Sequence, residues 1–135
     1  MIERPDEQHV DDHTRSLFAE IEAEFGMVPN FFREQATADP AWLALNWRRW
    51  QHIMGQQRAL DRKTKELLAV AVSLVKRCDY CTMAHEMSAR MAGCSDQEIT
   101  EMKEVVELFA SFTQIADALQ IPCDVKPARL QSSAS

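Results

Sequence analysis

The stretch that decides the fold is residues 67–75, Leu67-Leu68-Ala69-Val70-Ala71-Val72-Ser73-Leu74-Val75, the longest nearly apolar run in the chain. On a helix this run is apolar on every side, which is typical of a helix buried at the centre of a fold or of an oligomer. Its β-branched residues would also suit a buried strand, and periodicity alone does not separate the two. The length of the run and its helical neighbours favour a helix over about residues 61–76. The run is too short to span a bilayer.

Helices are predicted on both sides of this run, because apolar residues recur there at helical spacing between start and stop signals. Asp39-Pro40 places a capping side chain before a proline at the first helical position, and Ser95 with Glu98 forms a capping box. The chain has only 3 Gly and 5 Pro, which favours long helices over many short strands. We therefore predict an all-α, single-domain bundle of about six helices, with a CxxC at the start of one of them. The predicted helices cover residues 12–25, 29–38, 39–55, 61–76, 79–93 and 95–119.

The 135 residues are predicted to form one domain around one core, with loose polar ends at about 1–10 and 123–135. A net charge of −6 and the lack of a basic stripe argue against nucleic acid as a partner. Residues 1–7 lack the apolar stretch of a signal peptide, so we expect a cytoplasmic protein that does not bind membranes. In that compartment, clustered cysteines indicate catalysis, redox work or metal binding rather than structural disulfides.

The strongest chemical signal is Cys78-Asp79-Tyr80-Cys81, followed by His85. Two cysteines three residues apart near a helix start need only modest adjustment to form a disulfide. Unpaired backbone N–H groups and the helix dipole lower the pKa of a thiol in the first turn, while the charge of Asp79, the expected N-cap, works the other way. His85 follows Cys81 by one helical turn, where an imidazole can take the thiol proton or steady the thiolate.

Glu66 lies early in the apolar helix, and its spacing leaves two interpretations open. It either faces solvent, paired with Arg62 or Lys63, or is held inside the fold. Burial would tend to raise its pKa, which would make Glu66 a proton donor and acceptor near neutral pH.

A CxxC can also form half of a zinc site. Cys78, Cys81 and His85 would supply three ligands, completed by Cys94 or by the His9–His13 pair. Because the chain has no second CxxC, we favour a redox pair over a metal site. The other cysteines and the tryptophans are expected to serve packing, surface or interface roles: Cys94, Cys123, Trp42, Trp47 and Trp50.

The combined spacing of Glu66, Cys78, Cys81 and His85 resembles the active-site pattern of the alkylhydroperoxidase D-like branch of the carboxymuconolactone decarboxylase family. Segment 26–32, Gly-Met-Val-Pro-Asn-Phe-Phe, resembles that family's opening segment. Segment 89–99, Ala-Arg-Met-Ala-Gly-Cys-Ser-Asp-Gln-Glu-Ile, resembles the one after its catalytic helix. The resemblance spans about residues 26–105 and implies an all-helical homotrimer or homohexamer.

The resemblance also implies peroxide reduction by a redox-active disulfide, Cys78–Cys81, without a metal or other cofactor. Electrons would come from a dithiol partner such as a lipoyl group or a thioredoxin-like protein. Cys81 would attack the peroxide and Cys78 would resolve the sulfenic acid, while Glu66 and His85 relay protons.

Tyr80 departs from the family pattern, because well-studied members carry a histidine immediately before the second cysteine. A phenol is a poor proton relay at neutral pH, so peroxide reduction is expected to be affected more than thiol–disulfide exchange. The departure motivates an alternative, a non-enzymatic redox-sensing module that uses the same cysteines as a switch. Turnover separates the two, because an enzyme cycles with peroxide and a dithiol whereas a sensor oxidises once.

Overall fold

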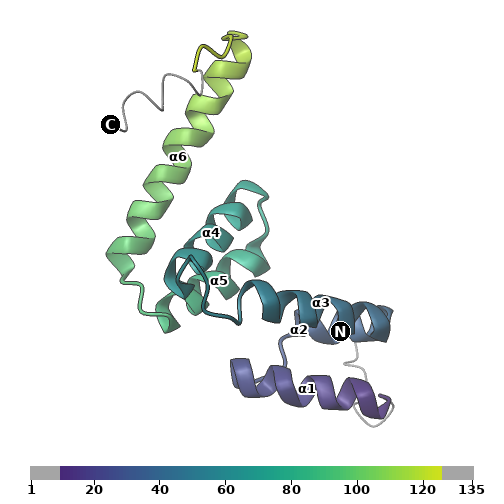
Figure 1. The fold of residues 1–135 in the computed structure, drawn as a ribbon. Helices are drawn as coiled ribbons and strands as arrows, with labels where there is room; N and C mark the ends of the chain where they lie inside the picture. The colour runs from purple at the N-terminus through teal and green to yellow at the C-terminus, as the bar shows by residue number, and fades with distance from the viewer. Residues whose placement is uncertain (1–9, 126–135) are drawn as a thin grey trace. The chain divides into compact units, whose positions relative to one another are not determined.

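The computed structural model describes residues 10–125, and within that range it contains six helices and no strand (Figure 1). This confirms the predicted all-α class and the predicted order of the helices. The predicted loose ends fall mostly on residues 1–9 and 126–135, outside the described part of the chain. The helices are α1 (Asp12–Phe25), α2 (Asn30–Ala38), α3 (Pro40–Ile53), α4 (Arg62–Val75), α5 (Asp79–Met91) and α6 (Asp96–Ala118).

Short polar side chains set the starts of most of these helices. Asp11, Asp61 and Ser95 each accept a hydrogen bond from the backbone N–H three residues later, which satisfies one of the donors left unpaired at a helix start. Asp39 accepts from the N–H of Ala41, with Pro40 at the first helical position. The structure divides these helices into two compact units, one ending at Ala59 and one beginning at Leu60. The single-domain organisation stays a prediction.

The first unit, helices α1 to α3, has an aromatic core. Trp47 is almost fully buried, stacks on Trp50 with ring centroids 5.0 Å apart, and donates its indole N–H to Glu20 at 2.8 Å. Trp47 and Trp50 take the predicted core role, whereas Trp42 is 51% exposed and its interface role stays a prediction. The buried members of this core are Leu17, Phe18, Ile21, Val28, Phe32, Ala36, Leu43 and Trp47.

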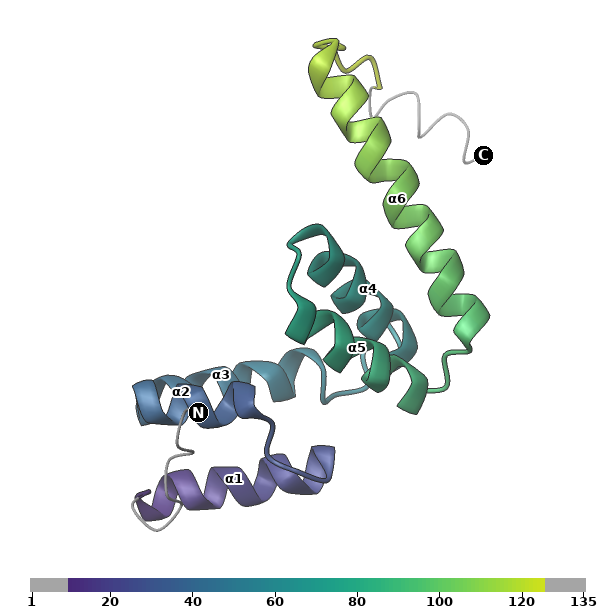
Figure 2. The same ribbon diagram turned by 180° about the vertical axis from the view of Figure 1, so that it is seen from behind.

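The second unit contains the residues singled out for chemistry. Helices α4 and α5 pack side by side, as Figures 1 and 2 both show, and the first turns of α6 complete a small core. Ala89, Cys94 and Ile99 are buried there, against Leu67 and Met102. Cys94 is therefore a packing residue, as expected.

Large hydrophobic side chains remain exposed on α4 and α6. Leu68, Val72 and Val75 of α4 are exposed in the described chain, so the apolar run is not buried at the centre of the fold. Its burial in an oligomer stays a prediction. The later turns of α6 run beyond α4 and α5 (Figure 2) and expose Val105, Leu108, Phe109, Phe112, Ile115 and Leu119. Among residues 10–125, no helix combines the length and apolar character needed to cross a bilayer.

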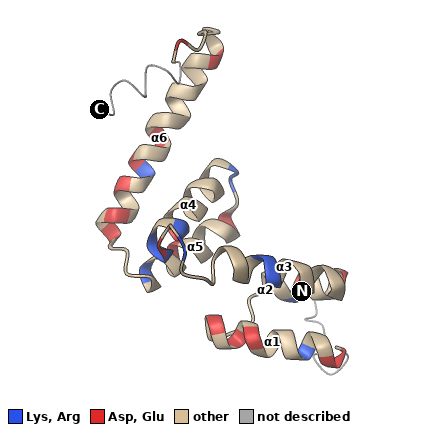
Figure 3. Cartoon of the chain, viewed as in Figure 1, with Lys and Arg blue, Asp and Glu red and all other residues tan. Residues whose placement is uncertain are grey.

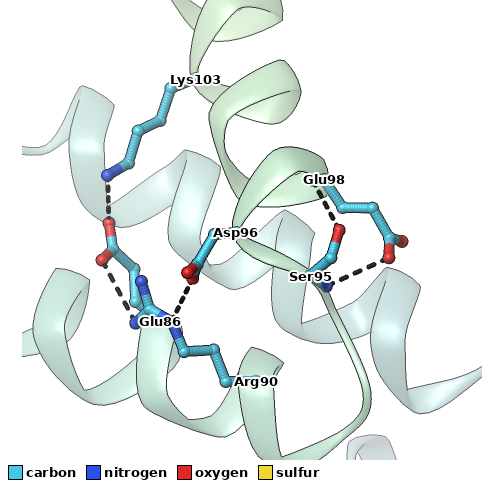
Figure 4. Close-up of polar contacts among 6 residues, drawn as sticks. All are labelled: Glu86, Arg90, Ser95, Asp96, Glu98 and Lys103. Carbon is cyan, nitrogen blue, oxygen red and sulfur yellow. Dashed lines mark hydrogen bonds and ion pairs between the residues drawn. The ribbon is translucent and has the colours of Figure 1, made fainter.

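Charged side chains attach the start of α6 to the other two helices. Acidic residues cluster in its first turns (Figure 3), where they also complement the helix dipole. Arg90 of α5 donates to Asp96 at 2.9 Å, and Lys103 contacts Glu86 at 2.6 Å (Figure 4). Lys63 of α4 pairs with Glu98, the capping-box glutamate, at 2.9 Å.

Candidate active site

The turn between α4 and α5 determines where Cys78 lies. The N–H of Cys78 donates to the carbonyl of Ser73 at 3.0 Å, and that of Arg77 donates to Leu74 at 3.1 Å. These two bonds define a Schellman motif, whose left-handed position usually holds glycine. Here Arg77 adopts it, with φ of 54°. The motif brings the chain from the end of α4 directly to the start of α5.

Cys78, rather than the predicted Asp79, is the N-cap of α5. Its backbone is extended and its sulfur accepts the N–H of Cys81 at 3.3 Å, while Asp79 is the first helical residue. The Schellman turn explains why the cap is Cys78 and not Asp79, because Cys78 is the residue that leaves the turn and enters the helix. The hydroxyl of Thr82 donates to the Cys78 carbonyl at 2.8 Å and steadies the cap.

The thiols of Cys78 and Cys81 are free and partly exposed, with their sulfurs 2.6 Å apart. The pKa of Cys78 is lowered by its hydrogen bond with the Cys81 thiol and by the backbone N–H of Cys81, against burial and the charge of Asp79. The pKa of Cys81 is raised, because its thiol is hydrogen-bonded to Cys78 and because it is partly buried. The two pKa shifts thus run in opposite directions, and the thiolate is favoured at Cys78.

Glu66 is held inside the unit, with only 2% of the residue exposed. Oε1 accepts from Nε of Arg62 at 2.9 Å, and Oε2 lies 3.0 Å from Nδ1 of His85. Burial raises the pKa of Glu66, but the hydrogen bonds and charges of His85 and Arg62 outweigh it and hold the pKa below its ordinary value. The raised pKa expected from the sequence is therefore wrong, and Glu66 is a carboxylate at neutral pH.

The ionised carboxylate of Glu66 decides the orientation of the His85 proton. A carboxylate only accepts hydrogen bonds, so Nδ1 of His85 must be the donor and Nε2 is left available. His85 follows Cys81 by four residues on α5, which places both side chains on one helical face. In the part of the chain that the structure describes, the imidazole bonds to Glu66 and to neither sulfur.

The structure thus brings the four predicted residues together as two bonded pairs, Cys78–Cys81 within α5 and Glu66–His85 between α4 and α5. Arg62 completes the second pair. The sequence indicated Arg62 only as the partner of a solvent-facing Glu66, whereas the structure shows a buried Glu66 that still contacts Arg62. The spacing of four residues on one helix was the signal for this contact.

The predicted metal alternative has no arranged site among residues 10–125, where no three potential His, Cys, Asp or Glu ligands are grouped to hold an ion. Cys94 lies in the small core and His9 lies outside the described residues. Cys123 is exposed, which agrees with the surface role that was one of the two roles expected for it.

The fold and the cysteine pair define a class, the all-helical proteins in which a CxxC opens a helix. The sequence profile of the carboxymuconolactone decarboxylase family matches residues 39–122, more than half of the chain, and the chain belongs to this family. Its relatives place it in the AhpD-like branch, which confirms the resemblance drawn from the residues.

Two curated relatives match about half of the chain. One is the "Uncharacterized protein 4 in cox locus" of Paracoccus denitrificans, 38% identical over 69 residues, which are 51% of this chain and 58% of the relative. The other is the alkyl hydroperoxide reductase AhpD of Corynebacterium kroppenstedtii, 34% identical over 62 residues, which are 46% of this chain and 34% of the relative. The chain thus spans less than two thirds of either relative.

The similarity to a solved structure is more extensive. The crystal structure of the alkylhydroperoxidase AhpD core from Rhodospirillum rubrum superimposes with a TM-score of 0.78 at 31% sequence identity. The match covers 90% of this chain and 93% of that one.

Proposed function

We propose that this protein is a thiol-dependent peroxidase or disulfide reductase that cycles Cys78 and Cys81 between a dithiol and a disulfide. The observation that carries the proposal is the 2.6 Å separation of the two sulfurs at the start of α5. A disulfide bond measures about 2 Å, so closure of the bridge requires only a small movement. The similarity to AhpD proteins supports peroxide as the oxidant.

In the first step, Cys81 attacks the peroxide. Because the pKa of Cys81 is raised, this thiol needs a base, and Nε2 of His85 is the available group on the same helical face. The resulting thiolate attacks one peroxide oxygen and breaks the O–O bond. His85 returns its proton to the departing alkoxide, so that an alcohol is released and Cys81 becomes a sulfenic acid.

In the second step, Cys78 resolves the sulfenic acid. Its lowered pKa favours the thiolate, which suits a resolving nucleophile. The S–S bond forms as the sulfenic oxygen leaves as hydroxide and takes up a proton to become water. The pair has then lost two electrons to the peroxide.

A dithiol donor closes the cycle, and we propose a lipoyl group or a thioredoxin-like protein for this role. One donor thiolate attacks the sulfur of Cys81 and releases Cys78, since the thiol of lower pKa leaves faster. The second donor thiol passes its proton through His85 to Cys81 and attacks the first donor sulfur, so the donor departs as a disulfide and Cys81 leaves as a thiol.

Thiol titration of the reduced protein before and after one equivalent of an organic peroxide tests the proposal, with mass spectrometry locating the bridge. We expect two thiols to be lost, a bridge between Cys78 and Cys81, and repeated turnover when a dithiol is supplied. Cys94 and Cys123 serve as internal controls and should stay reduced. Formation of the bridge without turnover would favour the redox switch that Tyr80 motivates, and absence of the bridge would refute both.

We further propose that the protein is a homotrimer or homohexamer. The exposed hydrophobic side chains of α4 and α6 support assembly, because monomeric proteins rarely expose apolar areas of this extent. Sedimentation at micromolar concentration is expected to show one oligomeric species, and a monomer would refute the proposal.

A further inference from the structure

The two oxygens of the buried Glu66 carboxylate are hydrogen-bonded to two different groups, an imidazole and a guanidinium. Oε2 bonds to His85 of α5, and Oε1 accepts from Arg62, which lies one turn earlier in α4. The side chains of Arg62 and His85 are each 33% exposed, against 2% for Glu66. A charge this deeply buried is costly unless it is paired and hydrogen-bonded, so both contacts matter to its ionisation.

We propose that Arg62 is a positioning residue of this site, which acts through Glu66 to decide which nitrogen of His85 carries the proton. The inference rests on the proposed function, in which Nε2 of His85 is the base. If Glu66 were protonated, it could donate to Nδ1, and the imidazole proton would then reside on Nε2. An imidazole in that form cannot take a proton from Cys81, so the ionisation of Glu66 determines whether the base works.

Arg62 places a guanidinium directly on the buried carboxylate of Glu66. Glu66 interacts electrostatically with Arg62 on α4, His85 on α5 and Cys94 after α5. The pKa of Cys94 is raised by burial, so this thiol is neutral. A guanidinium is not deprotonated in proteins, so Arg62 favours the Glu66 carboxylate whatever the state of His85.

Two substitutions separate the charge of Arg62 from its bulk. Arg62→Met keeps an apolar stem but removes the charge and the hydrogen bond, while Arg62→Lys restores a charge. We expect Arg62→Met to slow oxidation of the thiols by peroxide about tenfold at about pH 6, and by much less at about pH 8, because higher pH favours the Glu66 carboxylate. Arg62→Lys should recover most of the wild-type rate at both pH values. Lys63→Met is the matched control, because it removes a neighbouring cation that pairs with Glu98 instead.

The state of the His85 ring is read directly by ¹⁵N NMR of the reduced full chain labelled at histidine, with His85→Gln to assign the signals. We expect the proton on Nδ1 in the wild type and in Lys63→Met, and on Nε2 in Arg62→Met at about pH 6. In a Glu66→Gln background, adding Arg62→Met should change neither the ring state nor the rate, because Arg62 acts through Glu66. The Glu66→Gln background also removes the buried carboxylate charge that Arg62→Met would leave without its guanidinium partner. The double variant therefore still tests the inference if Arg62→Met alone does not fold.

The inference is overturned if Arg62→Met keeps the proton on Nδ1 and slows the reaction equally at both pH values, since that describes a purely structural role. Failure of Arg62→Lys to restore the wild-type ring state would also overturn it. The NMR measurement does not depend on turnover. A wild-type protein that peroxide does not oxidise would therefore refute the proposed function, while the role of Arg62 would still be decided by the His85 ring.

Discussion

The backbone N–H of Cys81 points at the sulfur of Cys78 from 3.3 Å, and the sulfur of Cys81 itself lies 2.6 Å from the same atom. Cys78 is thus the N-cap of α5, and its sulfur accepts the N–H of the second cysteine. The relationship gives the two thiols opposite pKa shifts, downward for Cys78 and upward for Cys81. The position of Cys78 favours its thiolate, whereas Cys81 would gain more from a base.

Alkylation should therefore reach Cys78 first. In the reduced protein at about pH 7, iodoacetamide is expected to label Cys78 roughly tenfold or more faster than Cys81, because the thiolate is the reactive form. In Cys78→Ser, the hydrogen bond that raises the pKa of Cys81 is altered and the thiolate charge beside it is gone, so Cys81 should react faster than in the wild type. Mass spectrometry of quenched time points measures both rates. Faster labelling of Cys81 in the wild-type pair would contradict the assignment.

Peroxide should nevertheless be attacked by Cys81, because His85 is one helical turn from Cys81 and two turns from Cys78. We expect Cys78→Ser to leave an oxidisable Cys81, trapped as a sulfenic acid, and Cys81→Ser to abolish the reaction. His85→Ala should slow it by about 10²-fold or more, as loss of a general base does. His52→Ala is the matched control, since His52 lies on α3. Sulfenate labelling of Cys78 in Cys81→Ser at the wild-type rate would reverse the roles.

The buried carboxylate should make stability depend on pH in one direction. The pKa of Glu66 is lowered in the folded protein, so its contribution to the free energy of unfolding is present above its ordinary pKa and is lost as pH falls through the folded pKa. We expect Glu66→Gln to cost about 2 kcal/mol near pH 7, from the hydrogen bonds to charged partners that it loses. The difference should shrink as pH falls below the ordinary pKa of Glu66. Urea titrations of both proteins across this range measure it, and a difference that grows as pH falls would contradict the lowered pKa.

The left-handed backbone at Arg77 should be a local weakness. Arg77→Gly is expected to raise the free energy of unfolding by up to about 1 kcal/mol, because glycine occupies this conformation without the steric penalty of a Cβ. Gly93→Ala is the opposite control. Gly93 follows the end of α5 with φ of 101°, so adding a Cβ there should lower the stability of the protein. Urea denaturation measures both changes. Destabilisation by Arg77→Gly would show that the arginine side chain, rather than the backbone, holds this turn.

Much of this protein is determined by interactions between residues at most four positions apart. Caps such as Asp61 and Ser95, together with helical periodicity, placed the helices to within about two residues, because capping bonds and turn contacts are local. The spacing of Cys78, Cys81 and His85 is local in the same sense, since α5 alone sets their common face. Because this spacing is local, the resemblance to the AhpD-like branch could be identified from the sequence alone.

Only the tertiary structure decided the state of Glu66. Nineteen positions separate it from His85, so their hydrogen bond exists only once α4 and α5 pack together. From the sequence, burial alone predicted a raised pKa. The fold supplies burial and two partners at once, and their sum has the opposite sign. The physical reason is that desolvation and pairing act on one carboxylate with opposing effects, and their balance depends on contacts between helices that no local pattern encodes.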